Sequence, residues 1–295
     1  MKRFFLFFSL LFACLSATFA KSSATRDLAL SLYSDGDTTP AAIEFRRLAF
    51  ETDKPDEQAA WNWMAAYCYA IGAETNRIDL TTRGLDRAEQ TATGDDLAVA
   101  LSWLRAETAA DARKWQQAAF YYRSLEHKAT TNDAARDYAI RGQAVAQLKM
   151  GHPERAHGLL EGLSKPDEQK ATLEAIDSYA AANRKSPLLG GLLGIIPGLG
   201  YLYSGEYGNA ARSLFLNGIF IWGMVETAQE DYWGLFSVIT FGELTWYSGS
   251  IYGGIDSAHR YNRHQLEKAL DVIEPAEAPR PDTAVLPIVH LRFTF

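Results

Sequence analysis

Residues 139–160 read AIRGQAVAQLKMGHPERAHGLL, and this stretch decides the expected fold. Small and apolar residues recur at helical spacing up to Met150, and a break at Gly151 and Pro153 precedes a second apolar helix. Alanine on the facing sides lets two such helices approach closely, while leucine and aromatic side chains fill the seam with the next pair. The stretch therefore predicts one helical hairpin.

The same pattern returns along residues 24–185, which are rich in Ala, Leu, Glu, Gln and Arg. Apolar residues precede and follow an Asp-Gly-Asp turn at Gly36, and Lys114–Tyr122 starts another second helix. The turn marks at positions 36, 72, 113 and 151 are separated by 36, 41 and 38 residues. A period of this size is typical of arrays of helical repeats, in which each hairpin stacks on its neighbour.

These features resemble the tetratricopeptide repeat over roughly residues 24–165, although the spacing exceeds that family's regular repeat. A generic solenoid of helical hairpins is the alternative. The resemblance implies a concave groove that binds peptide segments of partner proteins. Four aromatic residues are candidates to line this groove, and packing in the core between helices is the alternative for each of them: Trp61, Trp63, Trp103 and Tyr122.

The N-terminus has the order of a targeting segment. A basic pair at residues 2–3 precedes an apolar run at residues 4–15, and small residues follow up to Ala20. This order is typical of a secretory signal peptide, and we expect cleavage after Ala20. Residues 11–14, LFAC, offer a lipoprotein signal as an alternative, and an uncleaved signal anchor is another. After cleavage only Cys68 remains, in an apolar helical stretch that favours a buried, inert thiol.

Charge and motifs exclude several classes of function. The 295 residues carry a formal net charge of −7, so nothing offsets repulsion from the phosphates of a nucleic acid. Two cysteines are too few for a disulfide framework. The sequence contains no nucleophile elbow, paired catalytic carboxylates, zinc motif or nucleotide fingerprint. We therefore expect a protein that is not an enzyme and that uses no cofactor or metal.

The composition changes sharply at Ser186. Residues 21–185 contain 46 charged residues in 165, whereas residues 186–255 contain six in 70, together with 14 of the 22 glycines. Three apolar segments follow, at 188–204, 210–225 and 232–255. The second and third are about long enough to cross hydrocarbon, and proline and glycine in the first suit a kinked or re-entrant segment. Glycine is a poor helix former in water, which favours a membrane domain over a water-soluble hairpin.

The most specific string is PGLGYLYSGEYGNA, residues 197–210. It resembles the P-G-x-G-x-x-Y-x-G signature of small bacterial membrane domains akin to the two-transmembrane-helix family, over about residues 186–264. That family commonly has Gln where Tyr201 stands here. The resemblance implies short hydrophobic helices linked by a Gly-rich turn. The candidate residues of this membrane domain are Pro197, Gly198, Gly200, Tyr203, Gly205, Arg212, Asn217, Glu243, His259 and Arg260.

Charged residues of this domain suggest specific roles. Glu243 is the single acid within an apolar helix, where a carboxylate is costly. We expect it to pair with Arg212 or to face Asn217 across a water-lined gap, and transfer of a proton or ion is the functional alternative. The Gly-rich turn with Arg212 is a candidate site for lipid phosphate, with a tight interfacial turn as the alternative. His259 and Arg260 suit a polar cap beside the membrane.

The chain ends in VHLRFTF, residues 289–295, after a linker rich in proline and acidic residues. Val289, Leu291, Phe293 and Phe295 share one face at period two, which predicts a strand. This strand is expected to dock at an edge of this protein or of a partner.

We therefore expect a mainly α chain: a helical-hairpin repeat solenoid, a small hydrophobic membrane helical hairpin domain and a short C-terminal strand. The expected parts are a signal peptide (1–20), tetratricopeptide-like repeats (24–185), a Gly- and aromatic-rich membrane domain (186–272) and a linker with its strand-like tail (273–295). The expected function is a bacterial cell-envelope scaffold whose periplasmic repeats bind envelope proteins, anchored by contact with membrane lipid. The inner membrane is preferred and the outer membrane is the other option. The alternative is a transporter-accessory or lipid-interacting module that uses the Gly-rich turn and Glu243.

Overall fold

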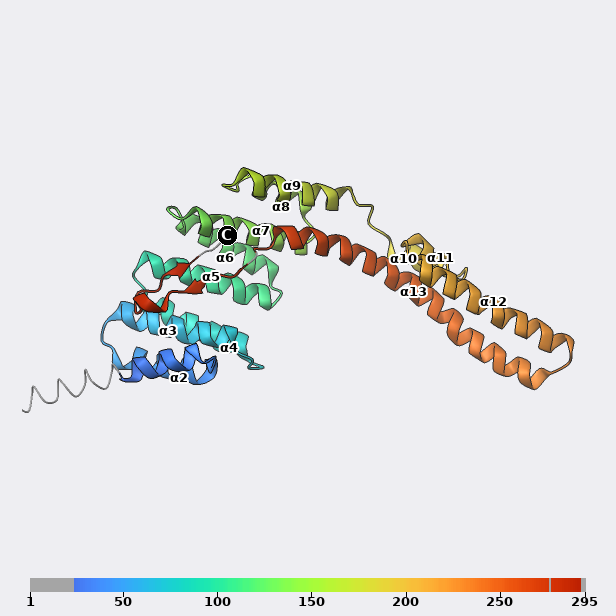
Figure 1. Cartoon of the computed structure of the whole chain (residues 1–295), viewed down its shortest axis with the longest axis horizontal. Helices are drawn as coiled ribbons and strands as arrows, with labels where there is room; N and C mark the ends of the chain where they lie inside the picture. Colours follow the sequence, from blue (N-terminus) through green and yellow to red (C-terminus); the bar gives the residue numbers. More distant parts are fainter. Residues whose placement is uncertain (1–23, 276, 293–295) are drawn as a thin grey trace, which may run out of the picture. The chain divides into compact units, whose positions relative to one another are not determined.

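The computed structural model describes residues 24–275 and 277–292, most of which are helical (Figure 1). The expectation of a mainly α chain is confirmed. The chain divides into two compact units, and the division falls inside α9 (Pro166–Ala181). The repeat unit contains the chain up to Leu173 together with Ile273 onward, and the hairpin unit is Glu174–Val272. The expected signal peptide lies outside the described residues.

The repeat unit is a series of helices, most of which pack on the next one in sequence. This arrangement is compatible with helical-hairpin repeats. After a helix over residues 24–34, the unit continues with α2 (Thr38–Glu51), α3 (Pro55–Ile71), α4 (Arg77–Thr91), α5 (Asp95–Asp111), α6 (Trp115–Lys128), α7 (Asp133–Lys149) and α8 (Pro153–Leu160).

Three of the four turn marks found in the sequence share one backbone geometry. Gly36, Arg113 and Gly151 have φ values of 83°, 54° and 84°, in the left-handed region. At each of them, the next backbone N–H donates to the carbonyl five residues earlier over 2.9 Å. This is the Schellman ending of a helix, which glycine adopts at the lowest steric cost. The turn near Gly72 lacks the left-handed residue, since φ there is −74°.

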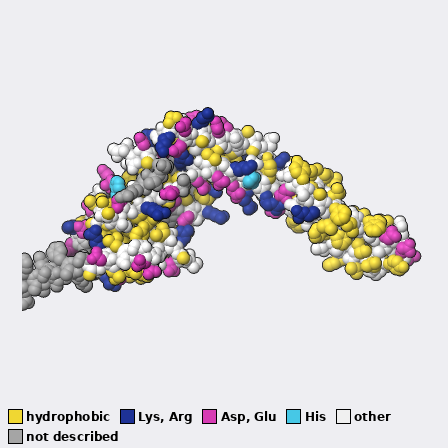
Figure 2. Space-filling view, viewed as in Figure 1, with side chains coloured by type: hydrophobic (Ala, Val, Ile, Leu, Met, Phe, Trp, Pro, Cys, Tyr) yellow, Lys and Arg dark blue, Asp and Glu magenta, His cyan; other side chains and the backbone are white. Residues whose placement is uncertain are grey.

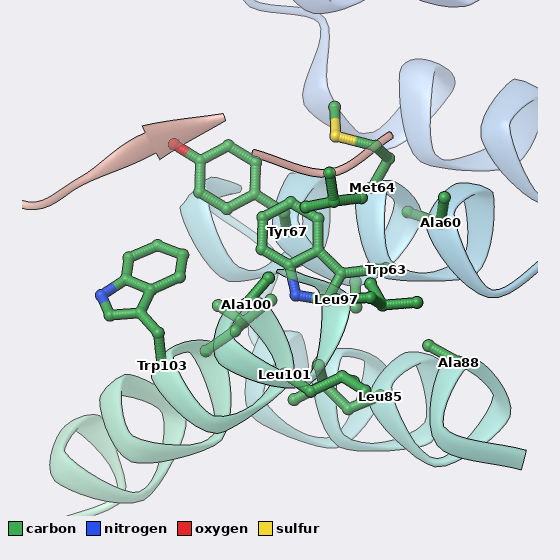
Figure 3. Close-up of a cluster of buried hydrophobic side chains, with 14 of the residues drawn as sticks. Ala60, Trp63, Met64, Tyr67, Leu85, Ala88, Leu97, Ala100, Leu101 and Trp103 are labelled. Atoms are coloured by element: carbon green, nitrogen blue, oxygen red, sulfur yellow. The ribbon is translucent and has the colours of Figure 1, made fainter. Parts of the chain in front are cut away.

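The core of the repeat unit is aromatic at its centre. Trp63 stacks on Tyr67 with ring centroids 5.5 Å apart, and Trp103 lies 6.0 Å from Tyr67. Figure 3 shows these rings, which come from α3 and α5, beside Leu85 of α4. The close approach of α3 and α4 depends on Gly84, because a Cβ there would lie 2.7 Å from the Cβ of Ala66.

The C-terminal tail packs on the repeat unit of the same chain. The tail consists of β1 (Arg280–Pro281), the 3-10 helix η1 (Thr283–Val285) and β2 (Leu291–Arg292), and its two strands pair antiparallel with Arg280 opposite Arg292. Leu286, Val289 and Leu291 are buried in the hydrophobic core of the repeats. The Arg26 guanidinium also donates to the carbonyl of Leu286 over 3.0 Å. Of the predicted strand face, Phe293 and Phe295 lie outside the described residues.

The hairpin unit places two short helices beside two long ones. These helices are α10 (Pro187–Leu193), α11 (Leu199–Tyr203), α12 (Tyr207–Gln229) and α13 (Trp233–Ile273). Within the described part of the chain, no helix combines the length and the apolarity that crossing a membrane requires.

Candidate functional site

The hairpin unit has an inverted distribution of polarity. All twelve buried residues between positions 186 and 255 are glycine or polar: Gly190, Gly191, Gly194, Gly198, Gly200, Ser204, Ser213, Asn217, Thr227, Glu243, Ser250 and Gly254. The large apolar side chains are outside, since 21 of the 29 strongly exposed ones in the described chain lie between Leu188 and Tyr252. Figure 2 shows hydrophobic side chains covering most of the visible face of this hairpin. We call these exposed side chains the apolar surface.

The interior faces of α12 and α13 meet at a hydrogen-bonded serine pair and at two glycines, Gly223 and Gly242, which lie close to Ile239 and Phe220. The hydroxyls of Ser213 and Ser250 lie 3.0 Å apart. The Asn217 amide donates to the carbonyl of Ser213 over 2.6 Å, which satisfies its donor within α12. Near the Gly-rich turn, the Ser257 hydroxyl donates to Ser204 Oγ over 3.1 Å. The interior therefore offers little apolar area whose burial would drive folding in water.

Glycines bring the short helices against α13. A Cβ on Gly190 would collide with the Gly254 carbonyl oxygen, and a Cβ on Gly200 would lie 2.7 Å from the Gly254 Cα. Gly198, which follows Pro197, has a left-handed φ of 89° and begins α11. Gly205, with a φ of 81°, ends it in the same Schellman geometry as the repeats. The Gly-rich string thus forms two tight turns around α11.

Several predicted residues meet at the polar end of the hairpin unit. The Tyr203 hydroxyl accepts from the backbone N–H of Ser186 over 3.0 Å, and the Lys185 ammonium lies 4.7 Å from the centre of the Tyr203 ring. Arg260 donates to both carboxylate oxygens of Glu206, each over 2.9 Å. His259 is exposed beside this cluster. An ion pair therefore ties the start of α12 to α13, and the polar cap beside the membrane stays a prediction.

The expected pair between Arg212 and Glu243 does not form. Arg212 is exposed and has no ion-pair or hydrogen-bond partner among the described residues, and Glu243 Oε2 is buried without a partner there. The reason is that Arg212 and Glu243 lie at different levels along the axes of α12 and α13. Ser213 lies opposite Ser250, which is seven residues, or about 10 Å of helix, beyond Glu243. Asn217 likewise buries a side-chain oxygen that has no partner in the described chain.

The aromatic residues predicted for a groove in the repeats lie in the core instead. Trp61, Trp63 and Tyr122 are buried, with Trp61 stacked on Phe45 at 5.9 Å. Their rings fill the seams between helices, where a residue of this size buries the most apolar area. The groove prediction is therefore corrected to core packing for these three residues. Trp103 is also buried, although it borders a cavity of about 420 Å³.

An acidic group that the sequence did not single out lies in the wall of that cavity. Glu107 accepts hydrogen bonds from the hydroxyls of Tyr122 and Tyr138 over 2.7 Å and 2.8 Å. Removal from water raises the pKa of Glu107, and the two phenol hydrogen bonds offset this in part. The same burial, with the nearby carboxylate, raises the pKa of both tyrosines. The fold brings these three together from α5, α6 and α7.

Comparison of the chain with protein-family models, with curated proteins and with solved structures gives no match. The proposed function therefore rests on the geometry of the two units.

Proposed function

We propose that this chain is a non-enzymatic scaffold of the bacterial cell envelope, in which helical repeats bind protein partners and the hairpin unit holds them at a membrane. The proposed role of the hairpin unit as a membrane anchor rests on one observation. Residues 186–255 bury glycine and polar side chains and expose large apolar ones. Water disfavours a contiguous apolar surface of this kind, which in soluble proteins marks a contact with another apolar phase.

Lipid accounts for both halves of this pattern. Helices in hydrocarbon gain nothing from hiding apolar side chains, so small residues and hydrogen bonds between helices hold them together. Gly190 against Gly254 and Ser213 against Ser250 are contacts of this kind. The serine, asparagine and glutamate side chains of the inner faces lower the apolarity of each helix as a whole. In this proposal the outer faces contact the acyl chains.

Charge along the hairpin supports the same assignment. Glu226 lies in the last turn of α12, Glu230 and Asp231 follow in the loop before α13, and Arg260 pairs with Glu206 at the opposite end. The 23 residues of α12 extend about 34 Å, close to the thickness of a hydrocarbon core. Apart from Arg212 and Glu243, ionised groups are thus confined to the two ends of the apolar surface.

Cell fractionation with protease accessibility tests the anchor, the export and the sidedness together. We expect the full-length chain in the membrane fraction after a carbonate wash, and we expect added protease to reach the repeat unit only when the periplasm is opened. Recovery of the chain in the soluble fraction contradicts the anchor. Protection of the repeats in spheroplasts contradicts their periplasmic location.

The scaffold half of the proposal is supported by the repeat-like helices, which present an extended surface. With the core aromatics buried, Phe50 and Phe120 are the most exposed large apolar side chains of the repeat unit. A photo-reactive phenylalanine at either position is expected to crosslink the full-length chain to a specific envelope protein in cells. Absence of a crosslinked partner from both positions contradicts a scaffold role.

A further inference from the structure

A cavity of about 340 Å³ lies between α11, α12 and α13 on the hairpin unit. Its polar lining includes Tyr201, Asn209, Arg212, Ser213, Trp246 and Ser250. Among the described residues, Arg212 is the charged member of the lining, and none of them borders the cavity with a carboxylate. The cavity is therefore electropositive and open at the edge of the apolar surface.

Part of the hydrogen-bonding capacity of this cavity is unused, whereas Asn209, Ser213 and Ser250 have partners within the unit. The Arg212 guanidinium, the Tyr201 hydroxyl and the Trp246 indole N–H make no hydrogen bond to any described residue. The nearest acid in sequence, Glu206, is occupied by Arg260 and by the amide of Asn209. An anion with several acceptor oxygens would satisfy the free donors, and an arginine fork suits phosphate in particular.

Glycines make room for these groups. Gly249 lines the cavity from α13. The Tyr201 hydroxyl end lies directly against Gly253, where any larger residue would displace it.

We propose that this cavity binds the phosphate of an anionic phospholipid headgroup, whose acyl chains lie along the apolar surface. This assignment rests on the proposed membrane contact and adds to it a site, a ligand class and a role for Arg212. An arginine near the edge of an apolar belt is placed to meet lipid phosphate, whereas the same charge deeper in hydrocarbon is costly.

Vesicle flotation of the full-length chain tests the site, with vesicles of phosphatidylcholine alone or mixed with phosphatidylglycerol. We expect phosphatidylglycerol to strengthen binding of the wild-type protein about tenfold, the effect of one charge-assisted contact. Arg212→Gln should remove most of this preference and leave binding to phosphatidylcholine intact. Trp246→Phe, which keeps an aromatic side chain but removes the indole N–H, should reduce the preference as well.

Arg263→Gln is the matched control, because it removes one exposed positive charge of the same unit outside the cavity. Equal losses in Arg212→Gln and Arg263→Gln overturn the site, since they indicate a general attraction to negative vesicles. Inorganic phosphate that abolishes the preference at constant ionic strength identifies free phosphate as the ligand and overturns the lipid assignment. Failure of every form to bind phosphatidylcholine overturns instead the proposed membrane contact, so the two failures are distinguishable.

Discussion

At the scale of single residues, Arg113 has a left-handed backbone conformation that glycine adopts at a lower steric cost. It takes the left-handed position of a Schellman turn, with φ at 54°, where the equivalent turns have Gly36 and Gly151. Its side chain is exposed and makes no hydrogen bond or ion pair with any residue that the structure describes. Arg113→Gly should raise the free energy of unfolding by about 1 kcal/mol, measured by urea denaturation. Lys114→Gly, one residue on with a negative φ of −87°, should give no comparable gain, and a destabilised Arg113→Gly would contradict the assignment.

Glu107 should make stability depend on pH in a direction that follows from its raised pKa. The folded carboxyl keeps its proton to higher pH than the unfolded one. Its stabilising contribution is therefore complete below the unfolded pKa and is lost as pH rises through the folded value. Glu107→Gln should gain thermal stability relative to the wild type as pH rises from about 4 to 7, as melting temperatures at a series of pH values would show.

Glu168 provides a control of opposite sign. Its pKa is lowered by hydrogen bonds from Lys165 and Arg141. That contribution is present above the unfolded pKa and is lost as pH falls through the folded value, so Glu168→Gln should lose stability relative to the wild type as pH rises. Parallel pH profiles for the two variants would show that at least one of the two carboxyls lacks the environment described.

At the scale of elements, helix spacing in the repeats depends on particular glycines. Gly84 faces Ala66 across α4 and α3 with no room for a Cβ, whereas Gly158 in α8 has open space around it. Gly84→Ala should lower the free energy of unfolding by about 1–3 kcal/mol, because the backbones must separate. Gly158→Ala should raise it by up to about 1 kcal/mol, because alanine is the better helix former. Chemical denaturation of both variants checks the pair, and similar effects would contradict the close contact.

The tail is an integral part of the repeat core. Leu291 is 6% exposed there, whereas Ile288 is 62% exposed three residues earlier. Leu291→Ala should lower the free energy of unfolding by about 2–4 kcal/mol, and Ile288→Ala should change it little. Thermal melts compared with the wild type measure both. Equal effects would show that the tail is not packed on the repeats as described.

Hydrophobic periodicity and turn residues predicted the ends of the helices better than they predicted the roles of the candidate site residues. The marks at Gly36, Arg113 and Gly151 located helix ends because their cause is local, in two or three residues. The roles of Trp61 and Trp63 were not local, since an aromatic residue on a helix suits a groove and a core equally until its neighbours are known. The cluster at Glu107 was not predicted for the same reason: Tyr122 and Tyr138 reach it from two other helices.

At the scale of the whole molecule, one chain contains two kinds of interior. The repeat unit buries large apolar side chains such as Trp63, Phe45 and Leu104, which is the pattern expected of a protein in water. The hairpin unit buries glycine and polar residues such as Gly190 and Asn217. The change of composition at Ser186 predicted that the chain has two parts of different character. It did not predict which side of each helix faces outward, or that Glu243 and Arg212 lie at different levels.

Site-directed spin labelling in vesicles tests the central claim most directly. Phe241 of α13 is 75% exposed and Phe50 of α2 is 89% exposed. The two positions therefore allow a comparison of an open site in each unit. Each is replaced by cysteine in a Cys14→Ser background, while Cys68 stays unlabelled because burial raises the pKa of its thiol to about 12. The label at 241 should be accessible to oxygen and shielded from a water-soluble nickel complex, with the reverse at 50. Equal access of the nickel complex to both labels would contradict a hairpin whose apolar surface lies in lipid.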